Sequence, residues 1–150
     1  MKKILLFSLV ALFSLPVFAQ LDPISWTFSA VKKGDKEYEV QMKAAIQDKW
    51  HLYSQTQPDD AIVIPSEIKF NPNPLFTTDA KIREEGKMEK YSDKALGISA
   101  NQYSGAVVFI QNIKLKAKAK TKITGTVEYQ TCDDKKCLPP KTIRFSIDLK

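Results

Sequence analysis

Apolar and polar residues alternate along several short stretches of this chain, and the alternation predicts β-strands rather than helices. Every second residue is apolar or glycine through residues 40–46, 123–129 and 143–149. Side chains two positions apart share one face of a strand, so each stretch would bury one face and expose the other. Residues 104–115 add a longer apolar strand. Weaker strand candidates are residues 24–31, 50–54, 62–70 and 80–83.

Turn-forming residues separate these strands. Pro, Gly, Asn, Asp and Ser gather at residues 33–35, 57–60, 71–74 and 104–105, and such clusters are typical of turns. Seven or eight short strands at this spacing predict an all-β fold, a β-sandwich, in one domain. Residues 84–101 carry many charges and two glycines, so we expect a long loop there. Long loops on rigid sandwiches often carry function.

The N-terminus has the pattern of a secretory signal peptide. Two lysines precede a largely apolar run at residues 4–18, and small residues follow where a signal peptidase cuts, so we expect cleavage before Gln20. A retained membrane anchor is the alternative, but the apolar run is shorter than the roughly 20 residues that span a bilayer. We therefore expect a signal peptide at 1–19 and a single exported domain at 20–150.

The positive charge of the chain is modest once the signal peptide is set aside. Residues 20–150 hold 21 Lys and Arg against 17 Asp and Glu. This excess does not argue for nucleic acid as a partner, and export argues against it. Five lysines stand at alternate positions from residue 114 to residue 122, and on a strand they would share one face. We interpret them as a solvated strand edge, with a docking patch for an acidic partner as the alternative.

The chain has only two cysteines, Cys132 and Cys137, and four charged, turn-forming residues separate them. The two thiols can meet across such a turn. Closing a loop of about six residues stabilises a fold by only about 2 kcal/mol in the chain-entropy model, so the short spacing weakens the case for a structural staple. A disulfide on an exposed turn is also open to exchange with another thiol. Spacing alone leaves a staple, a redox pair and a metal site as candidates.

A metal site is the least favoured of the three candidates. Zinc prefers four ligands, and His51 is the only histidine of the chain. Because His51 stands beside Trp50 and Tyr53, we interpret it as a packed neighbour of aromatic residues. The sequence shows no catalytic serine–histidine–aspartate set and no glycine-rich phosphate loop. A hydrolase or a nucleotide enzyme is therefore unsupported, and we expect no cofactor and no metal.

Three stretches resemble a known family, and the last is the most specific. They are residues 50–53 (Trp-His-Leu-Tyr), 93–97 (Asp-Lys-Ala-Leu-Gly) and 129–140, where a tyrosine comes three residues before the first cysteine and Pro-Pro follows the second. Together they resemble the N-terminal periplasmic domain of the thiol:disulfide interchange protein DsbD, over about residues 21–149.

The resemblance implies an immunoglobulin-like β-sandwich whose cysteine pair cycles between dithiol and disulfide. Cys132 and Cys137 would then be the catalytic residues. Tyr53 and Tyr129 would correspond to aromatic positions near the pair, and Pro139 would support it. The best-known members have five residues between the cysteines, whereas this chain has four.

The resemblance also implies a cap loop that shields the cysteines until a partner docks. The corresponding residues are Asp93, Leu96 and Gly97, with Leu96 as the apolar cover. Members of the family carry aromatic residues in the cap, whereas this chain carries Asp93-Lys94-Ala95-Leu96-Gly97.

The family further implies the partners and the compartment. Its domain accepts electrons from a thioredoxin-like domain and passes them to periplasmic thioredoxin-fold proteins, such as disulfide isomerases and cytochrome c maturation factors. Because this chain ends at Lys150, we expect a separate membrane protein to supply the electrons.

We therefore expect a periplasmic monomer acting as a component of a protein-disulfide reductase. Two alternatives stay open. One is a non-catalytic binding module whose disulfide is a loop staple, and the other is a substrate-binding accessory with degenerate redox chemistry.

Overall fold

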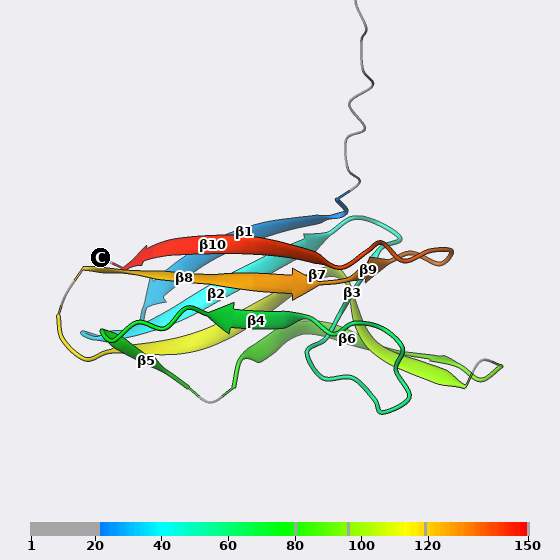
Figure 1. Cartoon of the computed structure of the whole chain (residues 1–150), viewed down its shortest axis with the longest axis horizontal. Helices are drawn as coiled ribbons and strands as arrows, with labels where there is room; N and C mark the ends of the chain where they lie inside the picture. The colour runs from blue at the N-terminus through cyan, green and yellow to red at the C-terminus, as the bar shows by residue number, and fades with distance from the viewer. Residues whose placement is uncertain (1–21, 80, 96, 119, 150) are drawn as a thin grey trace, which may run out of the picture.

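The computed structural model describes residues 22–79, 81–95, 97–118 and 120–149 (Figure 1). The expected signal peptide at 1–19 lies outside these ranges. All regular secondary structure in the described residues is β-strand, which confirms the predicted all-β class. No helix in this part of the chain is long and apolar enough to cross a membrane.

The described residues form ten strands, more than the seven or eight that the sequence predicts. Their bounds are β1 (Ile24–Lys32), β2 (Glu37–Ile46), β3 (His51–Tyr53), β4 (Glu67–Phe70), β5 (Phe76–Thr78), β6 (Arg83–Asp93), β7 (Ile98–Leu115), β8 (Thr121–Tyr129), β9 (Thr131–Cys132) and β10 (Lys141–Leu149).

The strands make two antiparallel sheets. In the first, the order is β1-β2-β7-β3-β9, and β5 and β6 also pair with the long strand β7. In the second, the order is β10-β8-β4. Figure 1 shows β10, β8 and β4 lying across the first sheet. This arrangement is the immunoglobulin-like sandwich that the resemblance implies.

The hydrophobic core lies between the two sheets. Burial alternates along β2, β8 and β10 as the sequence predicts, because every second side chain faces the opposite sheet. Aromatic rings join the sheets directly. Trp26 of β1 lies 5.4 Å from Tyr129 of β8, and Phe28 of β1 lies 5.1 Å from Phe145 of β10, as distances between ring centroids.

The prediction of a long loop at residues 84–101 is wrong. The segment forms β6 and the start of β7, joined by a tight turn in which Gly97 has a φ of 65°. Most β6 side chains are exposed on both faces, so the strand lacks the alternation that marks a half-buried strand. Backbone pairing with β7, from Arg83 to Asp93 with one irregularity, holds it in the sheet instead.

The lysines from 114 to 122 do not share one strand face. β7 ends at Leu115 and β8 begins at Thr121, so the lysines lie on and beside the turn between these two strands. Similarly, the weak strand candidate at residues 62–70 is a strand only from Glu67 to Phe70. Its first part belongs to a loop, residues 54–66, that reaches the cysteine pair.

Candidate functional site

The two cysteines sit on a short hairpin at one end of the sandwich. Cys132 ends β9, which pairs with β3 so that Cys132 lies opposite His51. Backbone hydrogen bonds close the hairpin: the Asp133 N–H donates to the Lys136 carbonyl at 2.9 Å, and the Leu138 N–H donates to the Thr131 carbonyl at 2.9 Å. Cys132 and Cys137 thus face each other across the turn, and a disulfide joins them.

The two sulfur-bearing residues differ in their access to solvent. Cys132 is only 4 % exposed and packs with Tyr53 and Ala100. Cys137 is exposed, as are the neighbouring residues Lys135 and Lys136. A thiol arriving from solution therefore reaches Cys137 first, since exchange requires direct access to the sulfur that is attacked.

The carboxylate of Asp133 shapes the turn between the cysteines. Its Oδ1 accepts hydrogen bonds from the backbone N–H groups of Lys135 and Lys136, each at 2.8 Å. These bonds favour the ionised form and lower the pKa of Asp133 below its usual value. The turn therefore carries two carboxylates, Asp133 and Asp134, and two exposed lysines, Lys135 and Lys136, and its formal charges balance.

A pocket of about 450 Å³ opens beside the disulfide. Tyr53 lines it from β3, Ile62 and Val63 from the loop at residues 54–66, Tyr91 from β6, and Cys137 from the cysteine turn. Ile62 is 75 % exposed and Tyr91 is 47 % exposed. Burial raises the pKa of Tyr53, and the nearby Tyr91 adds to the shift. The disulfide thus borders a hollow of mixed polarity, in which exposed Ile62 and Tyr91 lie on one part of the lining and Asp133 and Asp134 on another.

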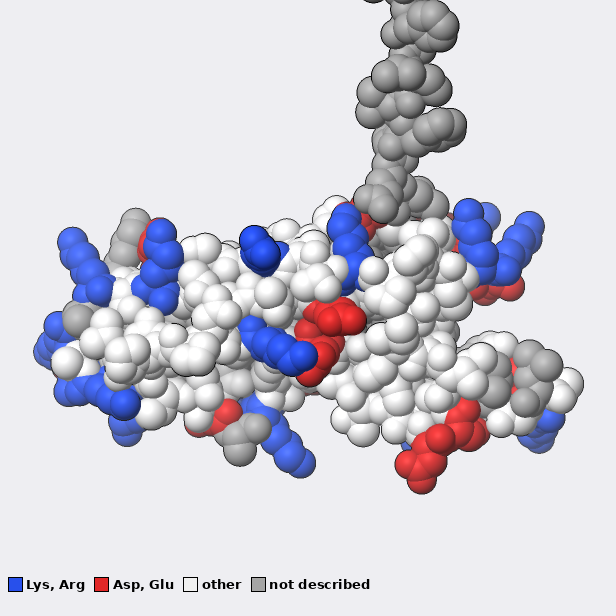
Figure 2. All heavy atoms as spheres, viewed as in Figure 1, with Lys and Arg blue, Asp and Glu red and all other residues white. Residues whose placement is uncertain are grey.

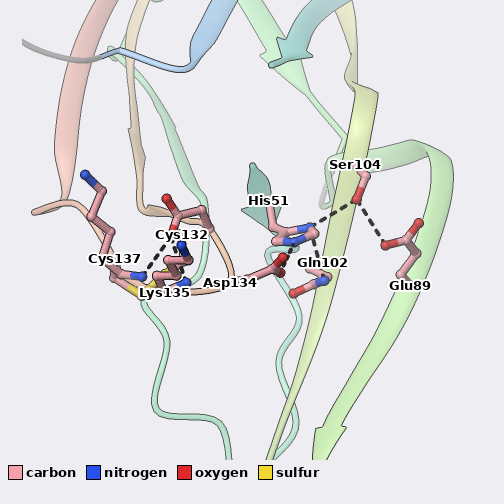
Figure 3. Close-up of polar contacts among 10 residues, drawn as sticks. His51, Glu89, Gln102, Ser104, Cys132, Asp134, Lys135 and Cys137 are labelled. Atoms are coloured by element: carbon pink, nitrogen blue, oxygen red, sulfur yellow. Dashed lines mark hydrogen bonds and ion pairs between the residues drawn. A yellow bond between two sulfur atoms is a disulfide. The ribbon is translucent and has the colours of Figure 1, made fainter. Parts of the chain in front are cut away.

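His51 carries polar contacts rather than aromatic ones alone. Its Nδ1 lies 3.0 Å from the Ser104 hydroxyl and 3.2 Å from the Gln102 side-chain nitrogen. Its Nε2 lies 3.7 Å from Oδ1 of Asp134, a residue of the cysteine turn. The Ser104 hydroxyl in turn donates to Glu89 at 3.1 Å. Figure 3 shows this chain of contacts running from the cysteine turn to β6, so it ties the turn to the first sheet.

The loop at residues 54–66 is held against β6 by Glu84. This carboxylate accepts hydrogen bonds from the Ser54 hydroxyl, the Gln55 backbone N–H and the Tyr103 hydroxyl, each at 2.7 Å. Burial and the Glu84 carboxylate raise the pKa of Tyr103, so its hydroxyl stays protonated as a donor. Glu84 therefore anchors the start of this loop, whereas hydrogen bonds from Ser99 to Asp60 and from the Ile64 N–H to Gln130 hold the part that carries Ile62 and Val63.

We expect Glu84→Gln to lower the free energy of unfolding by about 2 kcal/mol, because hydrogen bonds to a charged group are worth more than neutral ones. Denaturant unfolding measures the loss. Glu85→Gln is the matched control, since Glu85 is exposed on the same strand and should change stability by no more than about 0.5 kcal/mol. Equal effects of the two variants would contradict the anchoring role of Glu84.

Of the other three residues named from the sequence, only one lies beside the cysteine pair. Tyr53 contacts Cys132, whereas Tyr129 lies in the core and its hydroxyl donates to Asp22 at 3.3 Å. Burial and Asp22 raise the pKa of Tyr129 to about 12. Pro139 lines a separate shallow pocket that includes Tyr129 and Asp22.

The expected cap loop is the tip of the β6–β7 hairpin. Asp93 ends β6, its side chain accepts a hydrogen bond from the Ala95 N–H at 2.9 Å, and Gly97 makes the turn. Leu96 lies outside the described residues. Asp93 and Gly97 do not line the pocket, whereas Tyr91 and Ser99 lower on the same hairpin do. The shielding role of this loop stays a prediction.

Sequence reasoning missed His51, Ile62, Val63 and Tyr91 as residues of this site. The signal for His51 was its place in the Trp-His-Leu-Tyr stretch, but nothing local pairs that stretch with the cysteine turn. Among the described residues, no group of three His, Cys, Asp or Glu side chains could hold a metal ion.

Comparison with known proteins assigns the chain to a family. The family described as thiol:disulfide interchange protein DsbD, N-terminal, matches residues 18–149. No curated protein matches the chain at a significant level.

Two solved structures resemble the fold. The reduced DsbD N-terminal domain of Neisseria meningitidis is 17% identical with a TM-score of 0.53, and the match covers 83% of this chain and 84% of that one. The N-terminal periplasmic domain of ScsB from Proteus mirabilis is 15% identical with a TM-score of 0.51, and the match covers 83% of this chain and 44% of that one.

Proposed function

Since the chain belongs to the family of the N-terminal domain of the thiol:disulfide interchange protein DsbD, we propose that it relays electrons in the periplasm through a reversible Cys132–Cys137 disulfide. Thiol:disulfide interchange is the activity of the family, and the disulfide-bonded pair fits it. The relay role, the periplasmic location and the cleavage of residues 1–19 are parts of this proposal.

The observation that carries the proposal is the unequal exposure of the two cysteines. An exposed Cys137 next to a buried Cys132 gives an incoming thiolate one accessible sulfur and leaves the other as the departing group. A structural staple needs no such inequality. The open pocket beside Cys137 has room for the residues that surround the reactive thiol of a partner protein.

The exchange proceeds in two balanced steps. A donor thiolate attacks the Cys137 sulfur, the Cys132–Cys137 bond breaks, and its electron pair leaves on Cys132 as a thiolate that takes up a proton. The second donor thiolate then attacks the donor sulfur of the mixed disulfide and releases Cys137 as a thiolate, which takes up the second proton. Two electrons and two protons have reached this domain, and the donor has become a disulfide.

The reverse sequence reduces an acceptor. The Cys137 thiolate attacks one sulfur of the acceptor disulfide, and the other acceptor sulfur leaves as a thiolate and is protonated. The Cys132 thiolate then attacks Cys137, which re-forms the Cys132–Cys137 disulfide and releases the second acceptor sulfur as a thiol. The partners in this proposal are a thioredoxin-like donor, thioredoxin-fold acceptors and a separate membrane protein that supplies the electrons. Tyr53 packs against the cysteine pair. Tyr129, at the end of β8, supports the chain before Cys132, and Pro139 supports the chain after Cys137.

The test is trapping of the mixed disulfide. In Cys132→Ser the resolving thiol is missing, so we expect a covalent adduct between Cys137 and an oxidised thioredoxin-fold protein, visible on non-reducing gels and lost on reduction. The matched variant Cys137→Ser should give far less adduct because its remaining thiol is buried.

Two results would count against this function. Stronger trapping by Cys137→Ser would assign the attack to Cys132. No adduct from either variant, together with a reduction potential below about −300 mV, would mark the disulfide as a structural bond rather than a relay.

A further inference from the structure

The lysines of the β7–β8 turn lie beside those of the β1–β2 turn. Glu37 at the start of β2 pairs with Lys114 near the end of β7, and the Lys36 ammonium donates to the Lys116 carbonyl at 3.4 Å. The Lys116 N–H donates to the carbonyl of Leu75 at 2.9 Å. We call this end of the sandwich the basic pole, and it comprises residues 31–37 and 114–122, Leu75 and Asp148.

The net positive charge of the described protein is confined to the basic pole. The pole holds eight lysines and three carboxylates, an excess of five positive charges. The rest of the described chain holds 12 basic and 14 acidic residues, a net charge of −2. Figure 2 shows basic side chains gathered over the left end of the molecule, whereas the cysteine hairpin projects from the opposite end in Figure 1. The protein is therefore electrically asymmetric along its length.

The chemistry of the pole suits a diffuse anionic surface better than a single carboxylate site. All eight basic residues are lysines and none is arginine, so the pole presents flexible point charges rather than the fixed bidentate fork with which arginine binds one carboxylate or phosphate. Seven of the eight are exposed. Three of the eight, Lys114, Lys118 and Lys122, have side chains that are 70%, 68% and 58% exposed even though each forms an ion pair within the pole.

Two exposed apolar side chains stand among these lysines. Val31, near the end of β1, and Leu75, before β5, are each 39% exposed. Lysines interspersed with exposed apolar side chains are the combination that binds the interface of an anionic bilayer, since the charges attract the headgroups and the apolar groups enter the layer beneath them.

We propose that the basic pole binds a bilayer surface that carries anionic phospholipid headgroups. This binding goes beyond thiol exchange and does not depend on it. Docked by this end, the protein directs the Cys132–Cys137 hairpin away from the bilayer, toward partners in the aqueous compartment.

Co-sedimentation with lipid vesicles tests the proposal, using residues 20–150, which contain every described strand. We expect binding to vesicles of phosphatidylglycerol mixed with phosphatidylcholine and none to phosphatidylcholine alone. Salt should release the protein, because the screening length falls from about 30 Å at 0.01 M to about 3 Å at 1 M. Each lysine near an anionic surface contributes about fivefold to partitioning, so the triple variant K116Q/K118Q/K120Q should bind about a hundredfold more weakly.

The matched control removes the same charge away from the pole. We expect K43Q/K87Q/K90Q, whose lysines are exposed on β2 and β6 outside the pole, to change vesicle binding by less than about threefold. Val31→Ser with Leu75→Ser should weaken binding severalfold at unchanged charge. Equal losses in the two lysine triples would overturn the proposal, and so would binding to polyglutamate without binding to anionic vesicles, which would assign the pole to an acidic protein.

Discussion

Replacing both cysteines with serine is expected to abolish thiol exchange while leaving the fold largely intact. The double variant Cys132→Ser/Cys137→Ser has no sulfur that can accept or return electrons, so turnover with a thioredoxin-fold dithiol should fall to the uncatalysed level. The disulfide closes a loop with a sequence separation of 5, and such a loop contributes only about 2 kcal/mol to the free energy of unfolding in the chain-entropy model.

The measurements are a coupled reduction assay and denaturant unfolding of the same preparation. A matched control is the oxidised wild-type protein against the wild type reduced by a small dithiol, because both keep the native side chains at this turn. Undiminished partner binding by the double variant, with a loss of stability well above about 2 kcal/mol, would favour the alternative of a binding module with a structural staple.

Gly125→Ala is expected to have the largest effect on stability, a loss of about 3 kcal/mol or more. Gly125 lies in the middle of β8, between Phe145 on β10 and Phe70 on β4. A Cβ at this position would lie 2.6 Å from Cζ of Phe145 and closer still to the backbone carbonyl oxygen of Lys69. Overpacking of this kind forces strain into side chains or backbone, and here the ring and the neighbouring strand would both have to move.

Gly34→Ala is the control for Gly125→Ala. A Cβ on Gly34 would meet only the side chain of Glu37 at 3.5 Å, an ordinary contact, so stability should stay the same or rise slightly as the unfolded chain loses freedom. Combining Gly125→Ala with Phe145→Leu should recover only part of the loss, because the Lys69 carbonyl remains in place. A small effect of Gly125→Ala in urea unfolding would show that β4 can move away from β8 at little cost.

The strands that face the core could be predicted from the sequence, whereas the strand that does not face it could not. β2 and β10 alternate apolar and polar residues because one face of each is buried. Burial of one face therefore produces a period of two residues that can be recognised in the sequence. β6 is held by backbone pairing with β7 and has few buried side chains. Every residue except proline can form the same backbone hydrogen bonds, so backbone pairing alone does not produce a side-chain pattern from which a strand could be predicted.

In the candidate site, contacts between residues close in sequence could be predicted, whereas contacts between distant segments could not. Cys132 and Cys137 could be paired from the sequence because their contact is local. His51 meets Asp134 only because β3 and β9 are neighbours, and Ile62 lines the pocket because bonds from Ser99 to Asp60 and from Ile64 to Gln130 hold its loop. Such contacts depend on the order of strands in the sheet, which local spacing does not encode.

The pairing of β9 with β3 has a consequence for how partners tell the two redox states apart. Hydrogen bonds to β3 hold Cys132 in the sheet, whereas Cys137 lies beyond β9 on the return side of the turn. Breaking the disulfide removes the covalent link across the turn, while the backbone hydrogen bonds from Asp133 to Lys136 and from Leu138 to Thr131 still hold residues 133–138 in their hairpin. A partner that must release the reduced form and retain the oxidised form, or the reverse, has to make that choice through contacts with these six residues.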